Sequence, residues 1–131
     1  MSSQCEIVPK DRFNEEGNLL ISDQYNNRVI EIDPRGEIVW SWGLGPLDFT
    51  HNSAVGVRSA ERVDKLTLIA CAGVMPGVTL EAKAGVLDNR VILLDKEGKV
   101  EWQYGQFGLA GTSCNLLNVP VHATVVPCST K

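Results

Sequence analysis

The sequence predicts an all-β protein made of short antiparallel strands that follow one another in meanders. Three observations support this prediction. Short apolar runs rich in Val and Ile alternate with turn signals that contain Asp, Asn and Gly. Gly occurs 12 times and Pro 6 times in 131 residues, which suits a chain with many tight turns. A stretch of 17 residues also occurs twice, so one supersecondary unit is repeated.

The repeat relates residues 27–43 (NRVIEIDPRGEIVWSWG) to residues 89–105 (NRVILLDKEGKVEWQYG) at an offset of 62. Eight of the 17 aligned positions are identical without a gap, a density that chance similarity does not explain. The identical pairs are Asn27/Asn89, Arg28/Arg90, Val29/Val91, Ile30/Ile92, Asp33/Asp95, Gly36/Gly98, Trp40/Trp102 and Gly43/Gly105.

Each copy of the repeat reads as two strands joined by a tight turn. The first strands are Val29–Asp33 and Val91–Asp95, and the second strands are Glu37–Trp42 and Lys99–Tyr104. Between them, Asp33–Gly36 has Asp first, Pro second and Gly fourth, which is the pattern of a type I turn. The second copy keeps the Asp and the Gly of this turn without the Pro.

Further strands are expected upstream of each hairpin. Asn18–Asp23 and Leu66–Cys71 precede the hairpins directly, and Cys5–Val8 and Ala54–Val57 come before those. Each unit is therefore predicted to be a meander of four strands. The segment Val119–Pro127 resembles a third copy of the first strand alone, because it ends in Val-Val-Pro as the first copy ends in Ile-Val-Pro.

The two units differ in the connection from their second to their third strand. Residues 24–27 make this connection in the first unit, whereas residues 72–88 make it in the second. The longer connection is either a tolerated surface insertion or a binding loop. Its portion Thr79–Ala84 has the composition of one helical turn.

Two kinds of repeated residue are expected to shape the backbone. Asp33 and Asp95 stand where a side chain caps a turn. Asn27 and Asn89 suit the left-handed conformation that Asn tolerates. These residues describe the scaffold rather than a site.

The other repeated residues are expected to join neighbouring units. Arg28 and Arg90 are predicted to pair with carboxylates between the units. Trp40, Trp42 and Trp102 are predicted to pack between neighbouring sheets, where an aromatic ring fills a wide gap.

The segment 18–43 (NLLISDQYNNRVIEIDPRGEIVWSWG) closely resembles an NHL-type repeat, and Ile38-Val39-Trp40 with the following aromatic-Gly resembles arylsulfotransferase-like propellers. This resemblance implies that residues 1–131 form a single region of the β-propeller type. The implied parts are blade 1 at about 4–43, blade 2 at about 53–105, and an extra strand at about 119–127. Two blades cannot close a ring, so either oligomerisation closes it, as in a six-bladed trimer, or the chain is a fragment of a longer parent propeller.

Composition excludes some functional classes. Twelve basic against 16 acidic residues give a net charge of −4, which argues against nucleic-acid binding. No run reaches the length needed to cross a bilayer, and the N-terminus lacks the pattern of a signal peptide, so a soluble protein is expected. The compartment stays unknown, with the cytoplasm slightly favoured.

The four cysteines, at positions 5, 71, 114 and 128, lack the spacing of zinc knuckles and of redox motifs. They are interpreted as free thiols, and a disulfide between Cys5 and Cys128 is the alternative.

Candidate site residues follow from the resemblance. It implies that the first strand of each blade lines a central channel, and that the connections 44–52, 72–88 and 106–118 share one face. His51 is the candidate catalytic nucleophile, because arylsulfotransferase-like propellers use a channel histidine. Asp48, Arg58 and His122 are candidate ligand-binding residues at the mouth of that channel. A hydrogen-bonded structural histidine is the alternative for His51.

The main functional hypothesis is a non-catalytic scaffold that binds a protein, peptide or glycan. An arylsulfotransferase-like or metal-dependent enzyme using His51 or His122 is the alternative. The chain contains only two histidines, so a three-histidine metal site would need several chains, and no metal is assigned. No cofactor is expected, because no Walker, Rossmann or Gly-x-Ser-x-Gly pattern occurs.

Overall fold

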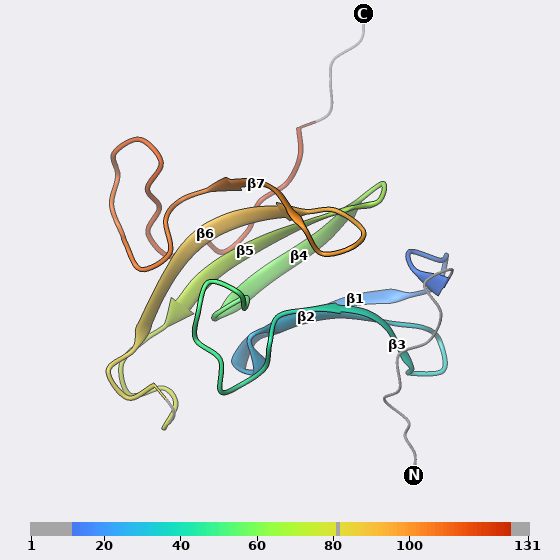
Figure 1. Cartoon of the computed structure of the whole chain (residues 1–131), viewed down its shortest axis with the longest axis horizontal. Coiled ribbons are helices and arrows are strands. Elements are labelled where there is room, and N and C mark those ends of the chain that lie inside the picture. The colour runs from blue at the N-terminus through green and yellow to red at the C-terminus, as the bar shows by residue number, and fades with distance from the viewer. Residues whose placement is uncertain (1–11, 81, 127–131) are drawn as a thin grey trace, which may run out of the picture.

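A computed structural model describes residues 12–80 and 82–126, which form two antiparallel sheets (Figure 1). The described residues contain no α-helix, so the all-β prediction is confirmed; the short 3-10 turn η2 spans Gln24–Asn26. Strands follow chain order in both sheets, as expected of meanders. The first sheet holds β1 (Leu19–Asp23), β2 (Arg28–Ile32) and β3 (Ile38–Trp42). The second holds β4 (Val57–Val63), β5 (Leu66–Val74), β6 (Val86–Leu94) and β7 (Val100–Tyr104).

The two repeated hairpins turn in the same way. An Asp33 carboxylate oxygen accepts hydrogen bonds from the backbone N–H groups of Arg35 and Glu37, each at 2.9 Å. Asp95 accepts the same two bonds one repeat later, at 2.9 and 2.8 Å. The turn-capping role predicted for both Asp residues is therefore confirmed.

The repeated Asn and Gly residues meet at the entrance to β2 and β6. Asn27 and Asn89 have φ values of 54° and 55°, the predicted left-handed conformation. A Cβ at Gly43 or Gly105 would collide with the backbone oxygen of the corresponding Asn. The Gly that ends each hairpin is therefore required because two backbone segments touch there.

The hydrophobic core lies between the two sheets, which stand one above the other in Figure 1. Trp40 and Trp42 project from β3 and donate their indole N–H groups to backbone carbonyls of the β6–β7 turn. These two tryptophans therefore pack between sheets, as predicted. The most buried core residues are Val29, Ala54, Val57, Ile69, Cys71, Ile92 and Leu94.

Trp102 does not pack between sheets in the described part of the chain, which corrects the prediction for this residue. Its side chain is 51% exposed and stacks on Tyr104, with ring centroids 6.3 Å apart. Trp102 lies on β7, at the edge of the second sheet, and its face of that sheet points away from the first sheet.

The pairing predicted for the repeated arginines is also wrong in its location. Arg28 pairs at 2.8 Å with Asp23, which lies directly opposite it on β1 of the same sheet. Arg90 pairs with Asp88 on its own strand. The nearest carboxylate is local in both cases. Within the described part of the chain, the ion pair that joins the sheets is Arg62 with Glu31, at 3.0 Å.

Several predicted strand limits change. The first strand of the second sheet is β4, from Val57, rather than Ala54–Val57, because residues 50–56 form turns that bring the chain across from the first sheet. β5 and β6 extend into the predicted long connection and shorten it to residues 75–85. Within 79–84 the described residues form no helix, only a turn at 82–84.

The predicted extra strand Val119–Pro127 is not formed in its described part, 119–126, which has no strand pairing. Cys5–Val8, Pro127 and the Cys5–Cys128 alternative lie outside the described residues. Cys71 is free and buried, and Cys114 is free and exposed. Among the described residues, no helix is long and apolar enough to span a membrane.

Candidate functional site

The three connections that were expected to share one face gather at one end of the sheets (Figure 1). The N–H of Gly108 donates to the carbonyl of Leu87 at 3.0 Å, and the N–H of Gly73 donates to the carbonyl of Val55 at 3.0 Å. The Asn27 side chain reaches the carbonyls of the connection between the sheets. These connections are thus fixed to one end of the sheets, a common place for binding residues.

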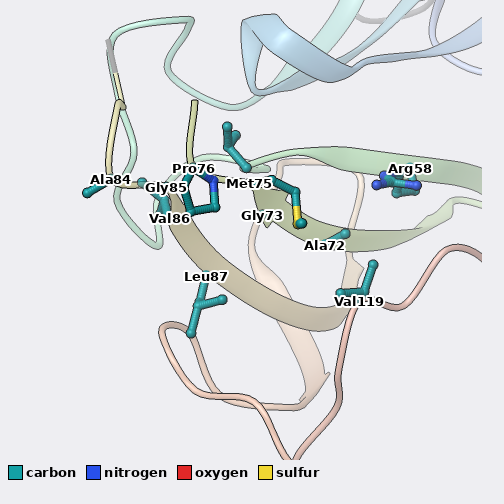
Figure 2. A pocket seen from close by; sticks show the side chains of 11 residues that line it. Arg58, Ala72, Gly73, Met75, Pro76, Ala84, Gly85, Val86, Leu87 and Val119 are labelled. Atoms are coloured by element: carbon teal, nitrogen blue, oxygen red, sulfur yellow. The ribbon is translucent and has the colours of Figure 1, made fainter. Parts of the chain in front are cut away.

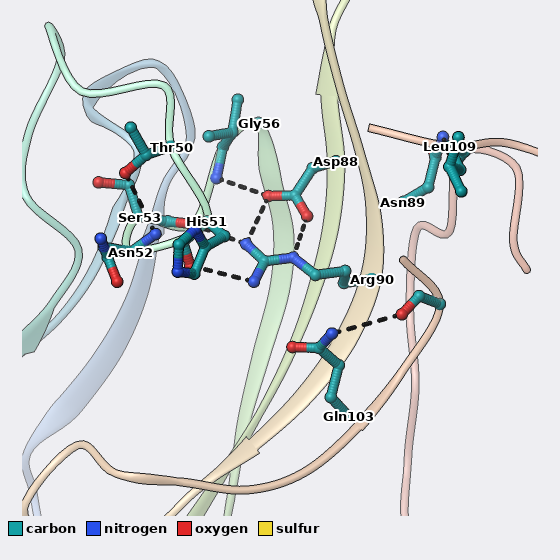
Figure 3. Close-up of polar contacts among 12 residues, drawn as sticks. Thr50, His51, Asn52, Ser53, Gly56, Asp88, Asn89, Arg90, Gln103 and Leu109 are labelled. Carbon is teal, nitrogen blue, oxygen red and sulfur yellow. Dashed lines mark hydrogen bonds and ion pairs between the residues drawn. The ribbon is translucent and has the colours of Figure 1, made fainter. Parts of the chain in front are cut away.

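A buried ion pair holds the connection between the sheets. Nε and Nη2 of Arg90 donate hydrogen bonds to the two carboxylate oxygens of Asp88 (Figure 3). The same guanidinium donates to the carbonyls of His51 and Ser53 at 3.1 and 3.0 Å. Asp88 in turn accepts the N–H of Val55 at 3.1 Å. The pair therefore clamps residues 51–55 onto β6.

The electrostatics of the Asp88–Arg90 pair favour a structural role. Burial raises the pKa of the Asp88 carboxyl, against the opposing effect of Arg90. Burial also raises the pKa of the neighbouring Cys71 thiol well above its usual value, so the thiol stays protonated and unreactive. Both charges of the pair are covered by protein, and their polar atoms bind other protein groups. A substrate therefore has little access to the Asp88–Arg90 pair.

His51, the candidate nucleophile, contributes its backbone rather than its imidazole to this clamp. The exposed ring lies edge-on to Phe107, with centroids 6.5 Å apart. Phe107 also covers the guanidinium of Arg90 at 5.1 Å. Among the described residues, no side-chain hydrogen bond orients the His51 ring, whereas a histidine nucleophile or base is normally oriented by a third group.

Asp48, a candidate ligand-binding residue, caps its own loop. One carboxylate oxygen accepts the Thr50 hydroxyl at 2.6 Å, the Thr50 N–H at 3.0 Å and the Ser53 hydroxyl at 3.0 Å. These hydrogen bonds, led by that of the Thr50 side chain, lower the pKa of Asp48. Asp48 and His51 thus lie in one connection, with the Asp48 carboxylate already engaged.

His122 lies apart from that connection, in the exposed segment 119–126. This segment contacts β4 through the Thr124 hydroxyl, which donates to Glu61 at 3.2 Å. The part of the chain that the structure describes contains no cluster of three or more His, Cys, Asp and Glu side chains able to hold a metal ion.

Arg58 does line a cavity, of about 150 Å³, beside the long connection (Figure 2). Its walls are mainly apolar and come from the end of β5, the start of β6 and Val119. Arg58 is the one charged side chain among the lining residues. Its side chain is exposed and forms no ion pair with any described residue. The cavity walls include Ala72, Gly73, Val74, Met75, Pro76, Ala84, Gly85, Val86 and Leu87.

Sequence reasoning identified Arg58 and the long connection, but it did not bring them together. Two glycines explain the shape of the cavity. A Cβ at Gly73 would collide with the backbone of Val86 and Leu87, and a Cβ at Gly85 would lie 2.9 Å from the nitrogen of Pro76. Gly73 and Gly85, two of the three glycines in this connection, were the available signal, because such residues can mark close backbone approach.

No known protein family matches the chain, and no similar sequence is found among curated proteins.

Proposed function

We propose that this protein is a non-catalytic binding module of the β-propeller type, and that its ligand is a peptide segment of another protein. The observation that carries the proposal is the cavity beside the long connection, which has mainly apolar walls and is also lined by Arg58, a residue that forms no ion pair within 12–80 and 82–126. The ends of β5 and β6, the connection between them and Val119 supply the apolar walls, and Arg58 on β4 supplies the charge.

The dimensions of the cavity favour one side chain rather than a whole small molecule. Sites for drug-sized ligands usually measure roughly 300–1,000 Å³. A cavity of about 150 Å³ holds a group of the size of one aromatic ring. The guanidinium of Arg58 presents a planar fork that suits a carboxylate. The ligand is therefore an apolar or aromatic side chain next to an Asp, a Glu or a C-terminus.

The apolar lining also selects among the three ligand classes. A glycan needs many hydrogen-bonding partners and often an aromatic platform, and the lining residues contain no aromatic side chain. A peptide can place one apolar side chain in the cavity and keep its backbone in water. A peptide is for this reason preferred to a glycan.

The repeat supports the propeller part of the proposal. Two antiparallel meanders, related at an offset of 62, face each other across an apolar core with equivalent turns and equivalent left-handed Asn residues. Propeller blades are four-stranded antiparallel meanders, and the described residues form a three-stranded and a four-stranded meander, which supports this part of the proposal. The enzymatic alternative has less support, because His51 lies against Phe107 and Asp48 is engaged in its own loop.

A titration with two small probes tests the binding site. The probes are 3-phenylpropionate and 3-phenylpropanol, which share the ring and differ in the carboxylate. Amide chemical-shift changes are expected at Met75, Gly85 and Val119 with both probes. The carboxylate probe is expected to bind about two- to fivefold tighter, the strength of an exposed ion pair.

Arg58→Gln is expected to remove the preference for the carboxylate probe and to leave the binding of the alcohol unchanged. Arg35→Gln is the matched control, because Arg35 is also an exposed arginine but lies in the turn of the first sheet. The proposal is wrong if neither probe shifts the cavity amides, or if Arg58→Gln keeps the full preference. Selection of glycans rather than peptides at this cavity would also contradict it.

A further inference from the structure

The two sheets are joined by a specific contact between a turn and a pair of tryptophans. The indole N–H groups of Trp40 and Trp42 donate to the carbonyls of Lys96 and Gly98, each at 3.0 Å. A Cβ at Gly98 would lie only 3.1 Å from the Trp42 ring, so the turn lies directly against the indole. This contact therefore consists of an aromatic pair on one sheet and a glycine turn on the next.

Both halves of this contact recur in the chain, and no further sheet covers them among the described residues. The Tyr104 hydroxyl does accept a hydrogen bond from the N–H of Asn115 in the following connection, at 2.8 Å. Trp102 and Tyr104 are the repeat equivalents of the aromatic pair, and Trp102 is 51% exposed. Gly36 is the equivalent of Gly98 and has the same φ of +88°. A Cβ at Gly36 would have nothing within 4 Å, in contrast to Gly98. The second aromatic pair and the first turn are thus both available.

The surroundings of the two aromatic pairs also correspond. On the first sheet, Val29 lies opposite Trp42 and is fully buried against the second sheet. On the second sheet, Val91 lies opposite Tyr104 and Leu93 lies opposite Trp102. Cross-strand partners share a face, so these apolar side chains stand beside the exposed aromatic pair. Glu31 lies opposite Trp40 at the position that corresponds to Leu93, so the outer face of the second sheet is the more apolar of the two beside its aromatic pair.

In both units, a left-handed Asn accepts a hydrogen bond from the backbone of the segment that follows the sheet. The side-chain oxygen of Asn27 accepts the N–H of Gly56, which leads into β4, at 3.3 Å. The side-chain oxygen of Asn89 accepts the N–H of Val119, at 2.8 Å. The segment after the second sheet is therefore attached to Asn89 in the same way as the segment that leads from the first sheet into the second is attached to Asn27.

We infer that the outer face of the second sheet binds the first sheet of a second copy of this chain. In this contact Trp102 donates to the carbonyl of Pro34 of the second copy, and the aromatic pair covers the turn at Gly36. Each chain carries one exposed aromatic pair on its second sheet and one turn of its first sheet that no other described sheet covers. The contact is head to tail, and its repetition either closes a ring or extends the assembly.

Sedimentation velocity over a wide concentration range tests this inference. The wild-type chain is expected to form species with masses that are multiples of 14.3 kDa. Trp102→Glu removes the aromatic face, and Gly36→Asn fills the space in front of the turn with a residue that tolerates positive φ. Every chain of a single variant lacks the same half of the contact, so each variant alone is expected to sediment as a monomer.

A mixture of the two variants separates a head-to-tail contact from general stickiness. The intact turn of Trp102→Glu can bind the intact aromatic face of Gly36→Asn, so the mixture is expected to form a dimer and nothing larger. Leu47→Glu is the matched control, because Leu47 is 76% exposed and lies in the connection between the sheets. This control is expected to assemble like the wild type.

The near-ultraviolet circular dichroism of Trp40 and Trp42 confirms that each variant is folded. A wild-type chain that is monomeric at the highest concentration would overturn the inference, because another occupant would then cover the face. Folded single variants that still assemble, or a mixture that stays monomeric, would overturn it as well. The probe titration at Arg58 is independent of these outcomes, since it reports on the cavity of a single chain.

Discussion

Arg90→Ala is expected to be the most destabilising single change at the sheet end, although it lies outside the hydrophobic core. The Arg90 side chain is 2% exposed and its partner Asp88 is fully buried. The substitution leaves the Asp88 carboxylate without its cation and removes the donor from the carbonyls of His51 and Ser53. The connection between the sheets then loses its main attachment to β6.

The expected cost follows from these contacts. Removing one partner of a buried ion pair costs about 3–5 kcal/mol, because the other charge stays buried without compensation. For a chain of this size such a loss lowers the Tm by roughly 10–25 °C. Urea denaturation followed by circular dichroism measures the free energy of unfolding directly, and an unchanged m-value shows that the folded state is intact.

Arg28→Ala is the matched control, since Arg28 occupies the equivalent position of the first repeat. Its side chain is 35% exposed and pairs with Asp23, which is itself partly exposed. A pair of this kind contributes about 0–1 kcal/mol. The same substitution at two equivalent positions is therefore expected to differ several-fold in its effect.

The pH dependence of Arg90→Ala provides a second readout. Burial raises the pKa of Asp88 in the folded state, so folding favours the protonated carboxyl. Stability from such a group is fully present below the ordinary Asp pKa of 3.8 and is lost as pH rises through the raised value. Without Arg90 this effect grows, so the deficit of the variant is expected to be smaller at acid pH than at neutral pH.

Two results would refute the reasoning. Equal losses for Arg90→Ala and Arg28→Ala would show that burial of the pair does not set its contribution. Additive losses in the double variant Asp88→Ala with Arg90→Ala would show that the two residues do not act as a unit, whereas coupling predicts a double loss below the sum.

Three further predictions concern the turns and the thiols. Gly98→Ala is expected to destabilise the chain more than Gly36→Ala. Both positions have a φ of +88°, but only Gly98 contacts a tryptophan ring. Thermal unfolding at low concentration compares the two variants, and equal losses of stability would show that the contact with the ring does not contribute. The hydrogen bond from the Glu37 N–H is the main cause that lowers the pKa of Asp33 in the folded state. Stability from such a group is lost as the pH falls through the folded-state pKa. Asp33→Asn is therefore expected to flatten the acid limb, the fall of the free energy of unfolding at acid pH. An unchanged acid limb would show that Asp33 is not responsible. Iodoacetamide is expected to label exposed Cys114 in the folded protein and to leave buried Cys71 unlabelled until urea is added. Peptide mass spectrometry measures the labelling, and labelling of Cys71 before urea is added would contradict this prediction.

The hairpins were predictable from sequence because their signals are local. The Asp at the start of each turn, the Gly at its end and the left-handed Asn are all determined by the backbone within a few residues. Their recurrence at an offset of 62 strengthened each prediction. The same logic located β2, β3 and β7 within one residue of the observed strands, whereas β6 begins five residues before the predicted Val91.

The candidate site was less predictable, because it depends on contacts between distant residues. Arg58 and the long connection were both identified, but the cavity needs β4 and the ends of β5 and β6 side by side. The lengthening of β5 to Val74 was missed, since the run after Cys71 lacks a strand pattern and is ordered by pairing with β6.

The sequence by itself determined the all-β class, the repeated meander and the chemistry of the turns, because these depend on neighbours in the chain. Only the tertiary structure decided the roles of equivalent residues. Arg28 and Arg90 have the same local sequence, yet one is half-exposed and the other clamps the connection between the sheets. Trp40 is covered and Trp102 is exposed for the same reason. The energetic role of a side chain depends on what lies against it in space, which a repeat cannot specify.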